Sequence, residues 1–234
     1  MGKNVAIVAA KVGKNFLMGK QTVPALWDVS LSLPAGTLTA LTGPSGSGKS
    51  TLLHLIAGLE RVDSGTLEVL GTQVQSSSPA ELAALRLRQI GFVHQDFSLL
   101  ADLTLIENVR LPLEAVGTAR GDATIAARTA MARVGLEGLE ERFPAEVSGG
   151  QQQRAAIARA IVGDRTLVLA DEPTGSLDSK TGEEIMAVLG QLRDEGVTVV
   201  LSTHNPANLS HADHIAVLHD GTLVSFDTNE GDAA

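Results

Sequence analysis

The chain has 234 residues, a length typical of one domain or of one domain with a subdomain. Hydrophobic residues make up 44% of it and charged residues 19%, so the composition predicts a well-buried core and not a disordered chain. The net charge is −9, and its 27 acidic and 18 basic residues form no basic stripe, which argues against a nucleic-acid partner. There is no cysteine, which excludes a disulfide framework and a cysteine-based metal site.

The sequence carries no pattern typical of a signal peptide or of a membrane helix. The apolar stretch 5–10 is too short for a signal peptide. No run approaches the roughly 18 apolar residues that a membrane helix requires. We therefore expect a single domain over residues 1–234 that is soluble by itself and reaches a membrane only through a partner. The short polar segment 228–234 predicts a loose tail.

The first part of the chain mixes strand and helix patterns. Residues 22–40 and 64–75 are rich in Thr, Val and Leu between turn residues, which indicates an antiparallel β portion. Residues 37–42 also predict a strand that runs into a glycine-rich turn, followed by a helix over residues 49–57.

Later strands alternate with helical segments. Residues 90–94 predict a strand, and residues 166–170 and 197–202 are apolar throughout, as in the centre of a parallel sheet. Residues from about 98 to 162 carry almost no strand pattern, and helices are expected there over 123–134 and 150–162. The order predicts an α/β fold with a mostly parallel sheet, an antiparallel β subdomain and an inserted helical subdomain.

One motif predicts a phosphate-binding loop. Gly43-Pro-Ser-Gly-Ser-Gly-Lys-Ser50 lies between a predicted strand and helix and matches G-x-x-x-x-G-K-[ST]. Its glycines let backbone N–H groups converge on a phosphate chain, and the helix N-terminus adds partial positive charge. We expect Lys49 to reach the β- and γ-phosphates and the Ser50 hydroxyl to bind Mg²⁺. The residues predicted to hold the nucleotide here are Gly43, Pro44, Ser45, Gly46, Ser47, Gly48, Lys49, Ser50 and Thr51.

Two acids directly follow the predicted strand 166–170. They are Asp171 and Glu172, and the carboxyl edge of an open α/β sheet is where ligands bind. We expect Asp171 to hold the Mg²⁺ shell and Glu172 to polarise a water in line with the γ-phosphate. The alternative is an ordinary charged strand end. The phosphate loop makes that alternative weaker, but neither feature chooses among kinases, GTPases and motor ATPases.

A third motif carries a family resemblance. Val147-Ser-Gly-Gly-Gln-Gln-Gln-Arg154 resembles the signature sequence of the ABC ATPases, usually Leu-Ser-Gly-Gly-Gln. The order of motifs between residues 5 and 226 is also similar to that family: the phosphate loop, Gln95, the signature, the acid pair, Ser176-Leu-Asp178 and His204. The resemblance implies the ABC ATPase architecture, with a P-loop NTPase (RecA-like) core, and an ATPase that binds ATP and Mg²⁺.

The resemblance implies three further contacts within one chain. Phe16 matches the aromatic residue that stacks on adenine, and Gln95 matches the glutamine that touches Mg²⁺ and the attacking water. His204 matches the switch histidine at the γ-phosphate. With Lys49 and Glu172, the residues Gln95 and His204 make up the expected catalytic set. The alternatives are a core phenylalanine, a strand-end amide and a polar loop residue.

The resemblance also implies a site shared between two chains. Ser148, Gly149 and Gly150 would bind the γ-phosphate of ATP held by the other protomer, and Asp178 would cross the interface. A serine and two glycines at a helix N-terminus can form such an anion site. Two chains arranged head to tail would then enclose two ATP molecules, as a homodimer or pseudo-dimer.

Several segments look most like the lipoprotein-release and macrolide-export branch of the family, among them Gly91-Phe-Val-His-Gln95. This resemblance implies a separate membrane permease, driven by mechanotransmission or export, with the ATPase on the cytoplasmic face of the membrane. The alternative is a non-transport ABC ATPase that regulates a cell-envelope process through a permease-like partner. A soluble ABC protein of DNA or ribosomes, or a plain P-loop kinase, fits less well.

The residues after Gln95 are more apolar than an exposed hinge loop requires. We expect Leu99 and Leu100 to line a groove between the two lobes into which a short permease helix docks. The alternative is that these leucines pack inside the helical lobe, as Leu103 and Leu105 are expected to do.

Overall fold

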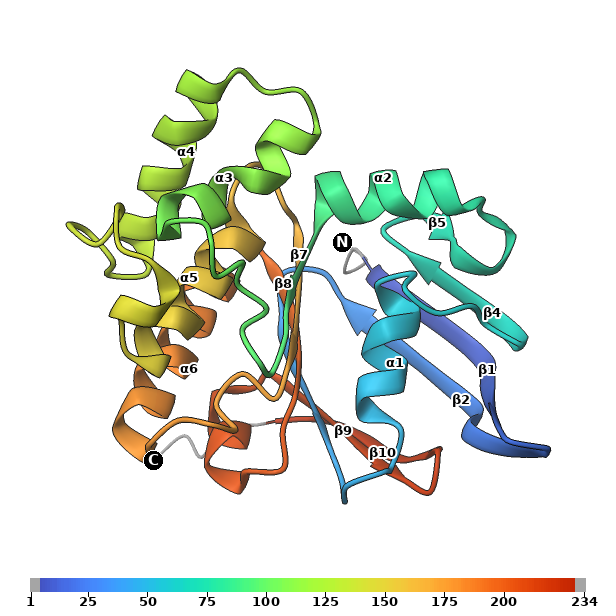
Figure 1. Cartoon of the computed structure of the whole chain (residues 1–234). Coiled ribbons are helices and arrows are strands. Elements are labelled where there is room, and N and C mark those ends of the chain that lie inside the picture. The colour runs from blue at the N-terminus through green and yellow to red at the C-terminus, as the bar shows by residue number, and fades with distance from the viewer. Residues whose placement is uncertain (1–4, 230–234) are drawn as a thin grey trace.

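The computed structural model describes residues 5–229, which form two β-sheets with helices packed against them (Figure 1). The larger sheet has six strands in the order β10-β9-β3-β8-β7-β6. The strands from β9 to β6 are parallel, and β10 joins the edge antiparallel to β9. Its strands are β3 (Leu38–Thr42), β6 (Ile90–Val93), β7 (Leu167–Asp171), β8 (Thr198–Ser202), β9 (His214–His219) and β10 (Thr222–Thr228).

The central strands of this sheet form because they are apolar and are covered on both faces. Every residue of β8 is buried, and so are the first four residues of β7. Successive side chains point to opposite faces, so Val199 and Leu201 join one hydrophobic cluster and Val200 joins the other. The predicted strands are confirmed to within one residue at each end: 37–42, 90–94, 166–170 and 197–202.

The smaller sheet is antiparallel, in the order β2-β1-β4-β5. An antiparallel portion was expected over residues 22–40 and 64–75. The first of these segments belongs to this sheet only as far as Pro34. The longest pairing in the sheet uses residues 5–18, for which no strand was predicted. Its strands are β1 (Val5–Met18), β2 (Gln21–Pro34), β4 (Ser64–Val69) and β5 (Thr72–Gln73).

The two sheets are joined by packing and by a backbone hydrogen bond. Ile7 of β1 and Leu67 of β4 belong to the same buried cluster as Leu41 of the larger sheet. The N–H of Trp27 in β2 donates to the carbonyl of Gly221, between β9 and β10, at 2.7 Å. The Trp27 side chain is 67% exposed.

A helical lobe lies between β6 and β7 in the sequence (Figure 1). It consists of α3 (Leu105–Ala115), α4 (Arg120–Arg133) and α5 (Gly149–Ile161). Residues 98–162 are all described and contain no strand, as expected. The remaining helices are α1 (Lys49–Ile56), α2 (Pro79–Gln89), α6 (Ser179–Asp194) and the short 3₁₀ helices η1 (Val74–Ser76), η2 (Pro144–Glu146) and η3 (Pro206–His211).

The segment that enters the lobe is fixed by local hydrogen bonds. Thr104 caps α3 in a reciprocal arrangement with Glu107. The buried side chain of Asn108 donates to three loop carbonyls and accepts from the N–H of Leu100 at 2.7 Å. Leu105 is fully buried, and Leu99 packs partly buried against the core, while Leu100 is 52% exposed. Leu99 therefore offers less surface to a partner than the sequence suggested.

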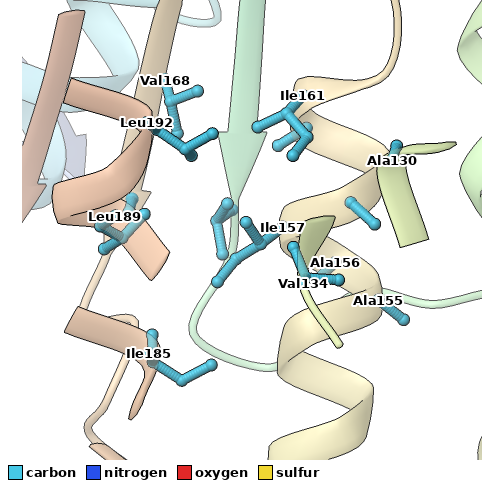
Figure 2. Close-up of a cluster of buried hydrophobic side chains, with 14 of the residues drawn as sticks. Ala130, Val134, Ala155, Ala156, Ile157, Ile161, Val168, Ile185, Leu189 and Leu192 are labelled. Atoms are coloured by element: carbon cyan, nitrogen blue, oxygen red, sulfur yellow. The ribbon is translucent and has the colours of Figure 1, made fainter. Parts of the chain in front are cut away.

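Two hydrophobic clusters cover the two faces of the larger sheet. One lies under α1 and the smaller sheet, and the other lies between the larger sheet and helices α5 and α6. Figure 2 shows Ile157 and Ile161 of α5 facing the same core as Leu189 of α6. A fully buried Ile or Leu side chain contributes about 1.5–3 kcal/mol, so this cluster fixes α5 firmly on the sheet.

Two residues of the expected loose tail, Thr228 and Asn229, have defined hydrogen-bonded positions. Thr228 is the last residue of β10 and pairs with His214. The N–H of Asn229 donates to the Asp213 carbonyl at 2.8 Å. The rest of that predicted tail, 230–234, lies outside the described residues. Within residues 5–229, no helix is both long and apolar enough to cross a bilayer.

Candidate active site

The predicted phosphate loop connects β3 to α1 and depends on its glycines. Gly43, Gly46 and Gly48 all have positive φ, of 140°, 79° and 100°. A Cβ on Gly43 would lie 2.0 Å from the carbonyl oxygen of Leu218, and one on Gly48 would lie 2.6 Å from Leu26 Cδ2. Only glycine tolerates these backbone angles and close contacts, so the conformation of the loop explains why the motif has glycine at these positions.

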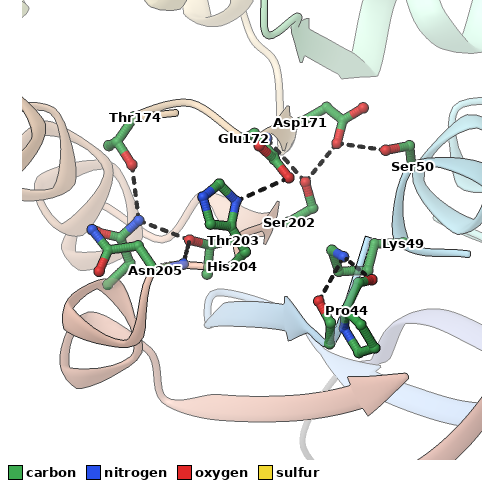
Figure 3. Close-up of polar contacts among 12 residues, drawn as sticks. Pro44, Lys49, Ser50, Asp171, Glu172, Thr174, Ser202, Thr203, His204 and Asn205 are labelled. Atoms are coloured by element: carbon green, nitrogen blue, oxygen red, sulfur yellow. Dashed lines mark hydrogen bonds and ion pairs between the residues drawn. The ribbon is translucent and has the colours of Figure 1, made fainter. Parts of the chain in front are cut away.

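Lys49 opens helix α1 and lies over the loop. Its side chain is largely buried, and its Nζ donates to the carbonyls of Gly43 at 2.8 Å and Pro44 at 2.9 Å (Figure 3). The ammonium group is thus held where the backbone of the loop converges. A cavity of about 210 Å³ beside it is lined by Ser45, Gly46, Gly48, Lys49, Ser50, Thr51, Ala25 and Glu172.

Ser50 and Asp171 meet at the carboxyl edge of the sheet. Ser50 Oγ donates to Asp171 Oδ1 at 2.9 Å (Figure 3). A hydroxyl and a carboxylate are oxygen ligands of the kind that Mg²⁺ prefers, so the two residues fit the predicted metal site. Gln95 lines a neighbouring cavity of about 820 Å³ together with Asp171. In the described part of the chain, no group of three or more His, Asp or Glu side chains could hold a metal ion, so any ion here has few protein ligands.

Glu172 and His204 form a close pair. His204 Nδ1 lies 3.2 Å from Glu172 Oε1 (Figure 3). Glu172 has a φ of 46°, in the left-handed region that residues with a side chain rarely adopt. It lines both the phosphate-loop cavity and an adjoining cavity of about 300 Å³ that includes His204 and Thr174. Glu172 therefore stands between the phosphate loop and the histidine.

Ser202 was not predicted as a site residue from the sequence, although it forms hydrogen bonds with both Asp171 and Glu172. It is fully buried at the end of β8. Its Oγ donates to Asp171 Oδ1 at 2.5 Å and accepts from the N–H of Glu172 at 2.9 Å. The one signal in the sequence was its place as the last residue of an apolar strand, next to the strand that ends in the acids.

The predicted signature forms the N-terminus of α5, in the helical lobe. Ser148 caps that helix: its Oγ accepts from the N–H of Gln151, and its own N–H donates to Gln151 Oε1 at 3.0 Å. Gly149 lines the same cavity as Gln95 and Asp171. A Cβ on Gly150 would lie 2.4 Å from Thr181 Cγ2, so glycine is needed there for close packing against α6.

Asp178 and Phe16 lie outside this cluster of bonded side chains. Asp178 caps α6, accepting hydrogen bonds from the N–H groups of Lys180 and Thr181 and from the Thr181 hydroxyl. The Thr181 hydroxyl, above all, holds the pKa of Asp178 below its usual value. Phe16 belongs to β1 and is 38% exposed, with the ammonium of Lys14 at 5.2 Å from its ring centre.

The segment 95–100, which we call the glutamine loop, is held by α5. Phe97 and Ser98 both have left-handed backbone, with φ of 62° and 47°. The guanidinium of Arg159 donates to the carbonyl of Phe97 at 2.9 Å and to that of Ser98 at 2.6 Å. Burial lowers the pKa of Arg159, and the Ser98 hydroxyl, above all, lowers the pKa of Asp96.

A glycine loop between strand and helix, its lysine, and a strand-end acid bonded to the serine after that lysine together define a P-loop NTPase. The sequence profile described as "ABC transporter" matches residues 26–175. The chain belongs to the ABC transporter family.

Relatives within the family are similar over most of this chain. The macrolide export ATP-binding/permease protein MacB of Salmonella typhimurium (strain LT2) is 43% identical over 213 residues, which are 91% of this chain and 33% of that protein. MacB of Escherichia coli (strain K12) is 42% identical over the same shares. The chain thus spans about a third of the length of these curated relatives.

Solved structures match the whole architecture. The dimeric post-hydrolysis state of the ATP-binding cassette MJ0796 bound to ADP and Pi has a TM-score of 0.89 and 36% identity, over 96% of this chain and 99% of that one. A second dimeric structure of MJ0796, described as a bacterial ABC transporter cassette, also has a TM-score of 0.89, with 37% identity. The predicted ABC ATPase fold, with its parallel core and helical lobe, is confirmed.

Proposed function

We propose that this chain is one ABC ATPase domain that binds ATP with Mg²⁺ and hydrolyses the bond between the β- and γ-phosphates. The observation that carries the proposal is the position of Glu172, which lines the cavity beside Lys49 and contacts His204 at 3.2 Å. A carboxylate at that point can accept a proton from a water that attacks the γ-phosphate. The imidazole of His204 orients the carboxylate and reaches the same phosphate.

The other residues of the site position the nucleotide. The backbone N–H groups of the phosphate loop and the ammonium of Lys49 bind the phosphates. Ser50, Asp171 and Gln95 would hold Mg²⁺, which neutralises charge that develops on the phosphate oxygens. This assignment agrees with the bond between Ser50 and Asp171, at 2.9 Å.

The adenine contact is assigned to Phe16. Its ring is partly exposed on β1, and the Lys14 ammonium lies against it. Lys14 also pairs with Glu60 at 3.1 Å and is largely buried. Lys14 therefore contacts the ring, and the exposed part of the ring is available for stacking on adenine. Stacking reads no base edges, so GTP should compete with ATP.

The experiment that tests hydrolysis is Glu172→Gln. The variant should bind ATP as the parent does, while turnover falls by about 10²–10⁴-fold, the contribution of a general base. Binding is followed by titration calorimetry and turnover by phosphate release. Turnover within a few-fold of the parent would remove Glu172 from the role of base.

We further propose that two chains share each ATP. Ser148, Gly149 and Gly150 lie on the helical lobe, and they would bind the γ-phosphate of ATP on a second chain, with Asp178 at the interface. The dimeric MJ0796 structures support this arrangement. Lys49→Ala and Ser148→Arg chains, each inactive alone, should regain partial activity when mixed, because one site of the mixed dimer is intact. Full activity of Ser148→Arg alone would contradict a shared site.

The partner we propose is a membrane permease, which places the ATPase on the cytoplasmic face of the membrane. The name of the MacB relatives joins ATP-binding and permease functions. Two cavities of about 480 and 530 Å³ share Leu87 and lie between α2 and α3, where core and helical lobe meet. A short permease helix would dock there, and ATP-driven closure would move it. The alternative is a permease-like partner through which the ATPase regulates a cell-envelope process without transport.

Leu87→Asp tests this docking surface. A carboxylate in an apolar contact should abolish association with the permease, while ATP binding by the isolated chain persists. Co-purification from membranes measures the first effect and calorimetry the second. Retained association would move the docking surface elsewhere.

A further inference from the structure

Ser202 lies where the two strands that frame the site end together. It is the last residue of β8 and pairs with Asp171, the last residue of β7. Its side chain is fully buried. A buried hydroxyl at a strand end must find its partners among the nearest polar groups, and here both partners belong to the acid pair.

The directions of its two hydrogen bonds are fixed by chemistry. The carboxylate of Asp171 can only accept, so the Ser202 hydroxyl donates its proton to Oδ1, at 2.5 Å. The Glu172 N–H can only donate, so it bonds to a lone pair of the same hydroxyl, at 2.9 Å. With Ser50 also donating to Oδ1, two hydroxyl groups fix the orientation of the Asp171 carboxylate.

The hydrogen bond from the Glu172 N–H to Ser202 lies at a strained backbone position. Glu172 has a φ of 46°, a conformation that a residue with a side chain keeps only when its surroundings hold it. The Ser202 oxygen holds the N–H of Glu172 at that turn. The same turn directs the Glu172 side chain toward His204, at 3.2 Å, and away from Asp171.

We propose that Ser202 is a positioning residue that sets the two acids relative to each other. One hydroxyl orients the Asp171 carboxylate, on the side assigned to Mg²⁺, and the Glu172 backbone, on the side assigned to the attacking water. The inference rests on the proposed function for its catalytic consequence. A purely structural hydroxyl would affect stability without affecting turnover of bound ATP.

A matched set of variants separates these roles. Ser202→Thr keeps the hydroxyl and adds a methyl group. Ser202→Val has nearly the same shape as the Thr variant but lacks the hydroxyl, and Ser202→Ala removes the hydroxyl without adding volume. Thr198→Ala is the control at the opposite end of β8, because Thr198 is also buried and its Oγ1 accepts from the N–H of Gly36 at 3.0 Å. The control should lower the melting temperature and leave kcat unchanged.

We expect Ser202→Ala and Ser202→Val to lower kcat by about 10–100-fold, the effect typical of groups that orient metal ligands, with little change in KM for ATP. Ser202→Thr should remain within a few-fold of the parent. Equal kcat values for the Ala variant and the parent would overturn the proposal. So would equal kcat values for a folded Val variant and the Thr variant.

Amide hydrogen exchange of the nucleotide-free protein gives a readout that does not depend on activity. Exchange of the Glu172 amide should accelerate in Ser202→Ala and Ser202→Val and remain slow in Ser202→Thr and Thr198→Ala. Unchanged exchange in Ser202→Ala would overturn the proposal. If the parent hydrolyses no ATP, the proposed function fails, and the exchange result still decides whether Ser202 holds Glu172.

Discussion

The phosphate loop and the glutamine loop reach left-handed backbone in opposite ways. In the phosphate loop, glycines occupy every position of positive φ. In the glutamine loop, Phe97 and Ser98 occupy two successive positions of this kind. The first conformation is encoded by the residues themselves, and the second is imposed by Arg159 from helix α5.

This difference shows which of the two loops depends on other elements for its backbone conformation. The phosphate loop keeps its shape without help, since glycine pays no steric penalty there. The strained turn of the glutamine loop is held from outside, by Arg159 of α5 at Phe97 and Ser98 and by Asn108 of α3 at Leu100. Because Ser148 at the other end of α5 belongs to the signature, one helix connects the glutamine loop with the site proposed for a second chain.

The largest effect expected from this comparison is that of Gly43→Ala. The added Cβ would lie 2.0 Å from the Leu218 carbonyl oxygen, at a φ of 140°. We expect loss of nucleotide binding and a decrease of about 2–5 kcal/mol in the free energy of unfolding, from clash and strain together. Gly46→Ala separates strain from clash, because its φ of 79° is also strained for alanine while a Cβ there meets nothing within 4 Å, so we expect a smaller loss than for Gly43→Ala. Normal ATP binding by Gly43→Ala would show that the loop tolerates rearrangement.

Arg159→Ala should release the glutamine loop. The variant removes both bonds to the carbonyls of Phe97 and Ser98, and hydrogen bonds to a charged group contribute about 1.5–3 kcal/mol. Hydrogen exchange over residues 95–100 should accelerate, and turnover should fall because Gln95 loses its position. Arg159→Lys keeps the charge without the planar fork and should recover only part of the effect. Unaltered exchange in the Ala variant would mean that the loop is held by other contacts.

Acid should destabilise the protein through His94, which directly precedes the glutamine loop. Burial lowers the pKa of His94 below the ordinary 6.5; nearby Arg159 and His54 also lower it, while Asp96 and Asp171 raise it. The unfolded chain therefore takes up a proton more readily, and stability is lost as the pH falls below about 6.5. His94→Phe, which keeps a ring beside Phe92, should lose less stability over that range. Chemical unfolding at a series of pH values measures both, and identical pH profiles would exclude His94 as the cause.

The smallest effect is expected for Ser98→Gly. Glycine adopts the φ of 47° without strain, but it gains entropy in the unfolded chain and loses the hydroxyl bond to Asp96 at 2.7 Å. The net change in the free energy of unfolding should be within about 1 kcal/mol. The pKa of Asp96 should rise toward its usual value, which NMR titration can follow. A large loss of stability would show that the glutamine loop depends on this serine.

The same contrast explains what could be predicted from sequence. The phosphate loop and the strands that end at Thr42 and Asp171 follow from local patterns, so they could be placed to within a residue or two. In residues 5–18, β-bulges interrupt the alternation of apolar and polar side chains, so no strand could be predicted there. Strands β9 and β10 carry no strong local pattern, and their pairing depends on the rest of the fold. Ser202 and Arg159 act through partners about 30 and 60 residues away, distances at which a single sequence carries no signal.

Trp27, at the junction of the two sheets, gives the chain an optical property. It is the one tryptophan of the sequence, and there is no tyrosine, so ultraviolet-excited emission comes from a single indole. That indole is mostly exposed, while its backbone is bonded to the turn at Gly221. Two residues before it, Ala25 lines the phosphate-loop cavity. Because this indole is already largely in water, its native fluorescence should report nucleotide binding beside it better than unfolding, and without a label.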